Sequence, residues 1–159
     1  MKKLVSFLSD ILIILLLLTV GATLALKYIG HAEMKAVLTG SMEPELPVGS
    51  LLVILPVSYE EIQIGDDITC VRDQNLTLVT HRVIEKDDET KSITTQGIAN
   101  NAPDTPTRYE NVVGRVEYHV PYAGYLVIWT SDKKGKIICG ILISALVAIS
   151  LLFSQDEKK

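Results

Sequence analysis

Residues 49–71, GSLLVILPVSYEEIQIGDDITCV, contain two short β-prone segments that are separated and bounded by turn-forming residues. The first segment, residues 51–55, ends at a proline, and the second, residues 67–71, follows the turn-forming pair Gly65-Asp66. Each is rich in leucine, valine or isoleucine and is too short for a typical buried helix. Short β-prone segments punctuated by turns are typical of β-strands, so this stretch predicts two strands of a sheet.

The rest of the region between residues 35 and 133 follows the same pattern and shows no long helical period. Residues 59–63 are compatible with one helical turn, and residues 87–89 are expected to form a charged hairpin loop. Further β-prone segments lie at residues 76–84, 92–95 and 112–116. The fold class expected for this region is therefore mainly β.

Two long apolar segments flank this region. Residues 11–29 would span about 28 Å as a helix and residues 137–153 about 25 Å, both close to the thickness of a bilayer's hydrocarbon core. We therefore predict a transmembrane helix at each end. A cleavable signal peptide is the alternative for the first segment, because Val20-Gly21-Ala22 resembles a cleavage site, and a buried core helix is the alternative for the second.

The lysines at the ends of these segments suggest an orientation. Lys2 and Lys3 favour a cytoplasmic N-terminus, whereas the lysines that precede residue 137 argue weakly for the opposite. Two spans place both termini on one side, so we expect a multi-pass protein of the plasma membrane. The resulting organisation is a cytoplasmic N-terminus at 1–10, an anchor at 11–29, an extracytoplasmic β catalytic domain at 35–133, a second helix at 137–153 and a cytoplasmic tail at 154–159.

Composition excludes several classes of function. The net charge of −4 provides no basic surface for nucleic acid. The two cysteines, Cys70 and Cys139, lie in the middle region and in the C-terminal apolar segment, so a disulfide between them is not expected. No Cys/His cluster suggests a structural zinc site.

Ser41 is the strongest candidate for a catalytic residue. It lies in Thr39-Gly40-Ser41-Met42-Glu43-Pro44, a glycine- and proline-flanked turn shortly after the first apolar segment. A serine hydroxyl becomes a good nucleophile when a base accepts its proton. His81, in Val79-Thr80-His81-Arg82-Val83, is the best base available, because imidazole titrates near neutral pH. His31 and His119 have no serine-bearing turn near them in the sequence.

A neutral histidine base works best when a carboxylate orients it. We select Asp104, which lies in the proline-rich loop Pro103-Asp104-Thr105-Pro106, and Asp66, Asp67 and Asp73 remain alternatives. For the oxyanion of the transition state, the expected donors are the backbone N–H of Ser41 and the hydroxyl of Thr39.

Five segments of the chain, in order, resemble the conserved boxes of type I signal peptidases, and together they cover about residues 38–126. The stretch Gly40-Ser41-Met42-Glu43-Pro44, with Pro47-Val48-Gly49-Ser50-Leu51, resembles the nucleophile box, and Val79-Thr80-His81-Arg82-Val83 resembles the general-base box. The others are Gly65-Asp66-Asp67-Ile68, Gly97-Ile98-Ala99-Asn100-Asn101-Ala102-Pro103-Asp104 and Tyr122-Ala123-Gly124-Tyr125.

Position 81 separates two branches of that family. The common bacterial enzymes have a lysine there, whereas the endoplasmic-reticulum-type branch, also found in archaea and spore-forming Gram-positive bacteria, has histidine. His81 therefore resembles the second branch. That branch usually carries an aspartate directly after the glycine of the last box, where this chain has Ile98, so Asp104 is the carboxylate that remains.

The resemblance implies an antiparallel β catalytic domain at a membrane surface and a serine endopeptidase that removes signal peptides from exported preproteins. Cleavage would follow small residues and would need no metal or organic cofactor. Expected partners are signal peptides, the lipid bilayer and the protein-export translocon. The alternatives are a related membrane protease with other substrates, a membrane-anchored binding or assembly subunit of the same fold that has lost catalysis, and a secreted β-domain.

Overall fold

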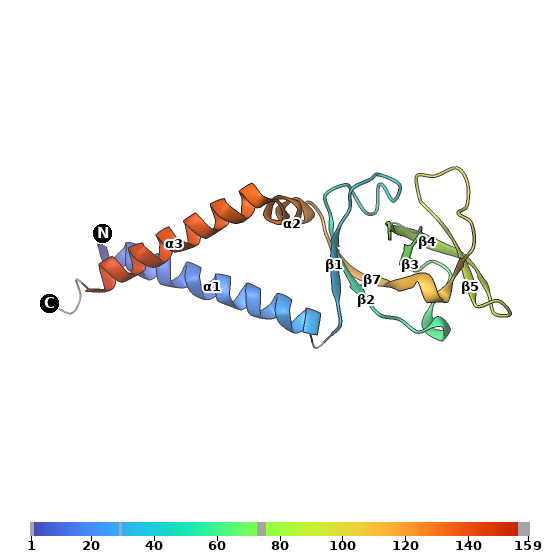
Figure 1. Cartoon of the computed structure of the whole chain (residues 1–159), viewed down its shortest axis with the longest axis horizontal. Helices are drawn as coiled ribbons and strands as arrows, with labels where there is room; N and C mark the ends of the chain where they lie inside the picture. The colour runs from blue at the N-terminus through green and yellow to red at the C-terminus, as the bar shows by residue number, and fades with distance from the viewer. Residues whose placement is uncertain (1, 29, 73–75, 156–159) are drawn as a thin grey trace. The chain divides into compact units, whose positions relative to one another are not determined.

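The structure is a computed structural model that describes residues 2–28, 30–72 and 76–155. The chain divides into two compact units, each of which is considered by itself (Figure 1). The first consists of Gly30–Ile128 and contains every strand that the structure describes. The second combines Met1–Ile29 with Trp129–Lys159 and contains the two long helices.

Seven strands form one sheet in the order β1-β2-β7-β3-β4-β5-β6, and every neighbouring pair is antiparallel. The mainly β, antiparallel fold class expected for this region is therefore confirmed. The strands are β1 (Glu33–Ala36), β2 (Leu51–Leu55), β3 (Asp67–Val71), β4 (Leu78–Asp87), β5 (Ser92–Gln96), β6 (Thr107–Arg108) and β7 (Val112–Val120).

The strands predicted at residues 51–55 and 67–71 are confirmed residue for residue, and the helical turn near residue 59 is the 3-10 helix η1 (Tyr59–Glu61). β1, β6 and the helix α2 (Gly124–Ser131) were not predicted. β1 and β6 are too short to show an alternating pattern of their own, so only pairing with a neighbouring strand defines them. A second 3-10 helix, η2 (Tyr109–Asn111), precedes β7.

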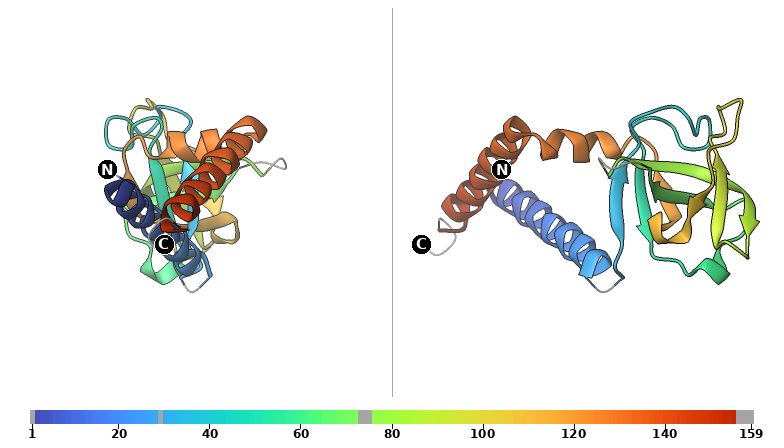
Figure 2. Two further views of the ribbon diagram at one scale, coloured as in Figure 1. Left: turned by 90° about the vertical axis from the view of Figure 1, so that its left-hand side faces the viewer. Right: turned by 45° about the vertical axis from the view of Figure 1, so that its right-hand side comes forward.

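The sheet is strongly curled, and the β1–β2 loop and the loop that follows β5 lie on the same side of it (Figure 2). The register shifts between Val53 and Ile54 on β2, between Thr69 and Cys70 on β3, and between residues 83 and 85 on β4. Such bulges increase the twist of a strand and bend it. The curvature allows one face of the sheet to enclose a core.

The core consists of two clusters of buried apolar side chains. The burial of β2 alternates, with Leu52 and Ile54 buried between half-buried neighbours, as expected for a strand with one face on a core. The first cluster contains Tyr59, Ile62, Ile68, Cys70, Val83 and Ile93. The second contains Met42, Leu46, Leu52 and Ile54, so it includes two residues of the segment that follows Ser41.

The second unit contains α1 (Lys2–Tyr28) and α3 (Lys133–Gln155). Near the start of α1 and the end of α3, the Ser150 hydroxyl donates to Asp10 Oδ1 at 2.7 Å, and the Ser9 hydroxyl donates to the Leu146 carbonyl at 3.4 Å. Within the described ranges, no helix is both long enough and apolar enough to cross a membrane. The two spans predicted at residues 11–29 and 137–153 are therefore not confirmed, and residues 29 and 156–159 lie outside the described part.

Candidate active site

Ser41 lies on the loop between β1 and β2. The Glu43 N–H donates to the Gly40 carbonyl at 3.0 Å and the Leu46 N–H donates to the Met42 carbonyl at 2.9 Å, so the segment turns tightly around Ser41. Met42 and Leu46 are each only 2% exposed, because they belong to the second core cluster. The serine is thus held on a turn whose next residues are anchored in the core.

The backbone of Ser41 is also held from the opposite side, by the segment that follows β5. The Ala99 N–H donates to the Ser41 carbonyl at 2.9 Å. Gly97 is required for this approach, because a Cβ at that position would lie 2.7 Å from the same carbonyl oxygen. Backbone contacts therefore fix the nucleophile loop on two sides.

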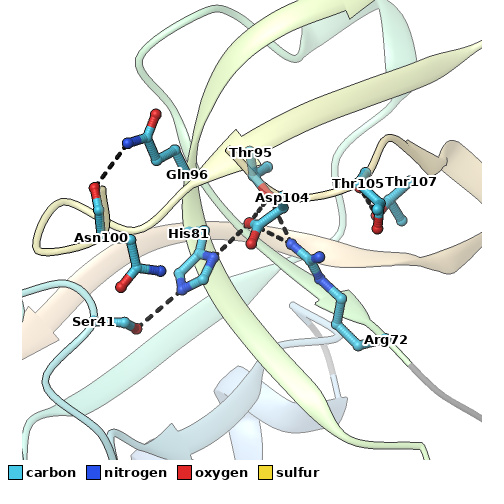
Figure 3. Close-up of polar contacts among 9 residues, drawn as sticks. All are labelled: Ser41, Arg72, His81, Thr95, Gln96, Asn100, Asp104, Thr105 and Thr107. Carbon is cyan, nitrogen blue, oxygen red and sulfur yellow. Dashed lines mark hydrogen bonds and ion pairs between the residues drawn. The ribbon is translucent and has the colours of Figure 1, made fainter. Parts of the chain in front are cut away.

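His81 lies on β4, opposite Ile68 of β3, and is only 6% exposed. Its Nε2 is 3.0 Å from Ser41 Oγ, and its Nδ1 is 2.6 Å from Asp104 Oδ2 (Figure 3). An ionised carboxylate can only accept a hydrogen bond, so Nδ1 carries the proton. Nε2 is then the acceptor, and the Ser41 hydroxyl donates to it.

Asp104 is held by its backbone and by its side chain. Its N–H donates to the Thr95 carbonyl at 2.8 Å, and its Oδ2 accepts a hydrogen bond of 2.7 Å from the Thr95 hydroxyl and an ion pair from Arg72. Burial acts to raise the pKa of Asp104, but the hydrogen bonds from His81 and Thr95 and the charges of His81 and Arg72 outweigh it. The pKa of this carboxyl therefore lies below its ordinary value, and the group is an anion at neutral pH.

The other carboxylates considered from the sequence have different partners. Asp67 accepts from Arg82 at 2.9 and 3.0 Å, and Asp66 accepts the Gln63 N–H at 2.9 Å and pairs with Arg115 at 3.5 Å. Asp73 lies outside the described residues. Among the aspartates that the structure describes, Asp104 is the one hydrogen-bonded to His81.

Of the two expected oxyanion donors, the Ser41 N–H belongs to the turn described above. Thr39 is exposed, two residues before the serine on the same loop. His31 and His119 are also exposed, and neither contacts Ser41 within the described part of the chain.

Ile98, at the position where the last box usually has an aspartate, packs against the cluster that contains Met42 and Leu46. An isoleucine suits this place because its neighbours are apolar. It follows that segment 97–99 contacts the nucleophile loop through an apolar side chain and one backbone hydrogen bond.

Two residues of the site, Arg72 and Thr95, were not predicted from the sequence. Both contact Asp104, yet Arg72 follows the end of β3 and Thr95 lies within β5. A charged residue directly after the apolar pair Cys70-Val71 was the available signal for Arg72. Nothing in the local sequence distinguishes Thr95 from neighbouring threonines.

A serine hydroxyl, a buried imidazole and a carboxylate that are hydrogen-bonded in that order on a β scaffold define the serine hydrolase class of enzymes. The described residues contain no group of three or more His, Cys, Asp or Glu side chains placed to hold a metal ion.

Comparisons with known proteins narrow that class. Over 139 residues the chain is 30% identical to the signal peptidase complex catalytic subunit SEC11 of Lachancea thermotolerans, covering 79% of this chain and 80% of the relative. It is 29% identical over 139 residues to SEC11 of Zygosaccharomyces rouxii, with the same coverage. It is 42% identical over 89 residues to signal peptidase I W of Bacillus subtilis, covering 54% of this chain and 45% of that protein. No family model matches the chain.

The chain belongs to the type I signal peptidase family, and the family resemblance inferred from the sequence is confirmed. It is accordingly a serine endopeptidase.

Proposed function

We propose that this protein removes the N-terminal signal peptides of exported preproteins, with Ser41 as nucleophile, His81 as general base and Asp104 as the residue that orients His81. The observation that carries the proposal is the hydrogen-bonded chain from Ser41 Oγ through both ring nitrogens of His81 to Asp104 Oδ2. Such a chain supplies what a serine nucleophile needs: a proton acceptor in the correct tautomer and a counter-charge for the imidazolium that forms.

In the first step, Ser41 Oγ attacks the carbonyl carbon of the scissile peptide bond while its proton moves to His81 Nε2. The imidazolium then donates this proton to the leaving amine, and an acyl-enzyme remains. Water, activated by the same nitrogen, releases the signal peptide. Asp104 stays ionised throughout and stabilises the positive charge of His81 in both steps.

The negative charge on the carbonyl oxygen needs donors near Ser41. We assign this role to the Ser41 N–H and the Thr39 hydroxyl. Because the Gly40 carbonyl accepts the Glu43 N–H at 3.0 Å, the peptide plane that contains the Ser41 N–H is held before substrate binds. Donors that are already oriented stabilise a developing oxyanion without the cost of reorganisation.

The proposed substrate is an extended segment that ends in small side chains, with alanine typical at the first and third positions before the cut. This specificity follows from the family resemblance. An extended segment can add to the edge of a sheet through its main-chain hydrogen bonds, and sheet edges are available in a curled, open sheet.

We extend the proposal to the membrane. Most of the large apolar side chains of α1 and α3 are exposed, including Leu17, Leu18 and Ile141 at 65%, 63% and 63%. Apolar surface of this extent is covered in a functional protein, and a bilayer would cover it. The proposed arrangement has helices at 11–29 and 137–153 in the plasma membrane, the catalytic domain at 35–133 outside and both termini in the cytoplasm. The export translocon is then a neighbour that supplies substrate.

The test is cleavage of a preprotein by the full chain in membranes. Ser41→Ala and His81→Ala should each abolish processing while the amount of protein stays unchanged. Asp66→Asn is the matched control, because it neutralises a carboxylate of the same domain that has no contact with His81. Full cleavage by Ser41→Ala would refute the role of that serine.

Two other functions have distinct outcomes. A binding subunit without catalysis would leave Ser41 unlabelled by an acylating active-site probe, whereas the geometry predicts labelling that requires His81. A protease with other substrates would fail to discriminate between peptides with and without an Ala-x-Ala site.

A further inference from the structure

One oxygen atom in the site has an unusual number of partners. Oδ2 of Asp104 accepts hydrogen bonds from His81 Nδ1 at 2.6 Å and from the Thr95 hydroxyl at 2.7 Å, and it also pairs with the Arg72 guanidinium. The Asp104 and His81 side chains are only 15% and 8% exposed, so solvent screens these contacts weakly. A full positive charge therefore lies directly against the carboxylate that contacts His81.

Arg72 reaches this position from the end of β3. Its backbone N–H donates to the Thr77 carbonyl at 2.9 Å, and its Nη2 donates to the Thr95 hydroxyl at 3.1 Å. Its Nε is buried and has no hydrogen-bond partner in the part of the chain that the structure describes. Burying an N–H group without a partner costs free energy, so stability of the fold alone explains this arginine poorly.

We propose that Arg72 is a positioning residue of the active site, which holds the Asp104 carboxylate on His81 and offsets its charge so that His81 rests as the neutral imidazole. This rests on the function proposed above for Ser41 and His81. A carboxylate without a cation would stabilise the imidazolium, and an imidazolium cannot accept the proton of Ser41. The cation on the same oxygen limits this effect while it keeps the carboxylate ionised.

The other groups around the hydrogen-bonded pair of His81 and Asp104 are consistent with this role of Arg72. On β3, burial raises the pKa of the Cys70 thiol to about 11, so the thiol is neutral. Ser41 and Thr95, which contact the pair from the nucleophile loop and β5, carry no charge. Among the described residues, the charged groups in contact with His81 or with its carboxylate partner are Asp104 and Arg72. On the nucleophile loop, the Glu43 carboxylate lies beside Gly40 and accepts the Val48 N–H at 3.4 Å, and Asp73 lies outside the described part of the chain.

The first test is the pH profile of kcat/KM for preprotein cleavage by the full chain. Its acid limb reports the ionisation of the free enzyme's base. Arg72→Gln should move this limb to higher pH by about one unit. Without the cation, the Asp104 carboxylate stabilises the imidazolium of His81 more strongly. The loss of rate should then be about tenfold below the limb and smaller above it. Arg72→Lys, which keeps the charge, should restore the position of the limb.

Arg108→Gln is the matched control, because Arg108 is an exposed arginine of the same unit. The substitution removes the same charge as Arg72→Gln. It should leave the limb in place. If Arg72→Gln does not fold, Arg72→Met provides a second uncharged side chain of similar length. A uniform loss of rate at every pH, with the limb unmoved, would mean that Arg72 is merely structural and would overturn the proposal.

The second test does not require catalysis. The full chain in detergent micelles, with histidines labelled at carbon ε1, reports the titration midpoint of each imidazole by NMR. The His81 signal is assigned by comparison with His31→Gln and His119→Gln. Arg72→Gln should raise the His81 midpoint by about one pH unit, and an unchanged or lowered midpoint would refute the proposal. If the wild type cleaved no preprotein while the midpoint still rose, the proposed function would fail and the electrostatic role of Arg72 would stand.

Discussion

Replacement of Asp104 by asparagine separates two contributions of the carboxylate, its charge and its geometry. All of its side-chain partners contact the same oxygen, Oδ2. Arg72 can only donate, and the Thr95 hydroxyl accepts from Arg72, so its own proton points to Oδ2. The atom at that place must be an acceptor. The amide of asparagine will therefore place its oxygen there, and His81 will keep its proton on Nδ1.

The loss of catalytic rate expected in Asp104→Asn therefore comes from the missing negative charge. The imidazolium formed during catalysis would face an amide instead of a carboxylate. Two unit charges about 4 Å apart interact by about 4 kcal/mol at an effective dielectric constant of about 20. Since each 1.36 kcal/mol is about a factor of ten, kcat should fall by about 10³-fold. Arg72 already neutralises part of the carboxylate, which makes this figure an upper value.

The assay is single-turnover cleavage of a preprotein substrate, with thermal unfolding as a check of folding. Asp66→Asn is the control and should stay within about twofold of the wild type, because this half-buried carboxylate pairs with Arg115 and does not contact His81. A loss smaller than tenfold in Asp104→Asn would refute the electrostatic role of Asp104. A larger loss of rate in Asp66→Asn than in Asp104→Asn would show that Asp104 is not the acid that orients His81.

Three further outcomes are expected. Gly97→Ala should lower kcat about 10²-fold, because the added Cβ would lie 2.7 Å from the Ser41 carbonyl oxygen and displace the serine. An unchanged rate of cleavage would contradict the close approach of residue 97 to Ser41. Thr95→Val should destabilise the domain by about 1–3 kcal/mol in chemical denaturation, since Asp104 and Arg72 each lose one hydrogen bond, and Thr95→Ser should recover most of that loss. The pKa of Asp104 is lower in the folded protein than its ordinary value of 3.8, so the ionised carboxylate stabilises the fold above that pH. This contribution is lost as the pH falls through the folded-state pKa, and Asp104→Asn should flatten this acid dependence of the unfolding free energy.

The local sequence was sufficient for elements whose side chains carry a pattern of their own. Residues 51–55 and 67–71 combine apolar or β-branched side chains with turn formers at their ends, and both are strands with the predicted bounds. β1 and β6 lack such a pattern, because four and two residues depend on their partners for pairing. The eight-residue helix α2 was also missed, since its short apolar sequence has no distinct helical period.

The residues Ser41 and His81 could be chosen from the sequence, because each lies in a motif with distinctive neighbours. For the carboxylate, the sequence favoured Asp104 but left Asp66, Asp67 and Asp73 as alternatives. Asp66 and Asp67 lie as close to a motif as Asp104 does, and only the tertiary structure directs them to arginines and Asp104 to His81.

Arg72 and Thr95 belong to the site only because antiparallel pairing of β3, β4 and β5 places the end of one strand beside the middle of another. A hydrogen bond forms between atoms that the register brings within reach, whatever their separation in the chain. The sequence by itself therefore determined the mainly β class, the family and the two side chains proposed to react. Which carboxylate contacts His81, and which cation accompanies it, were decided by the tertiary structure, because these contacts depend on distances that no local pattern encodes.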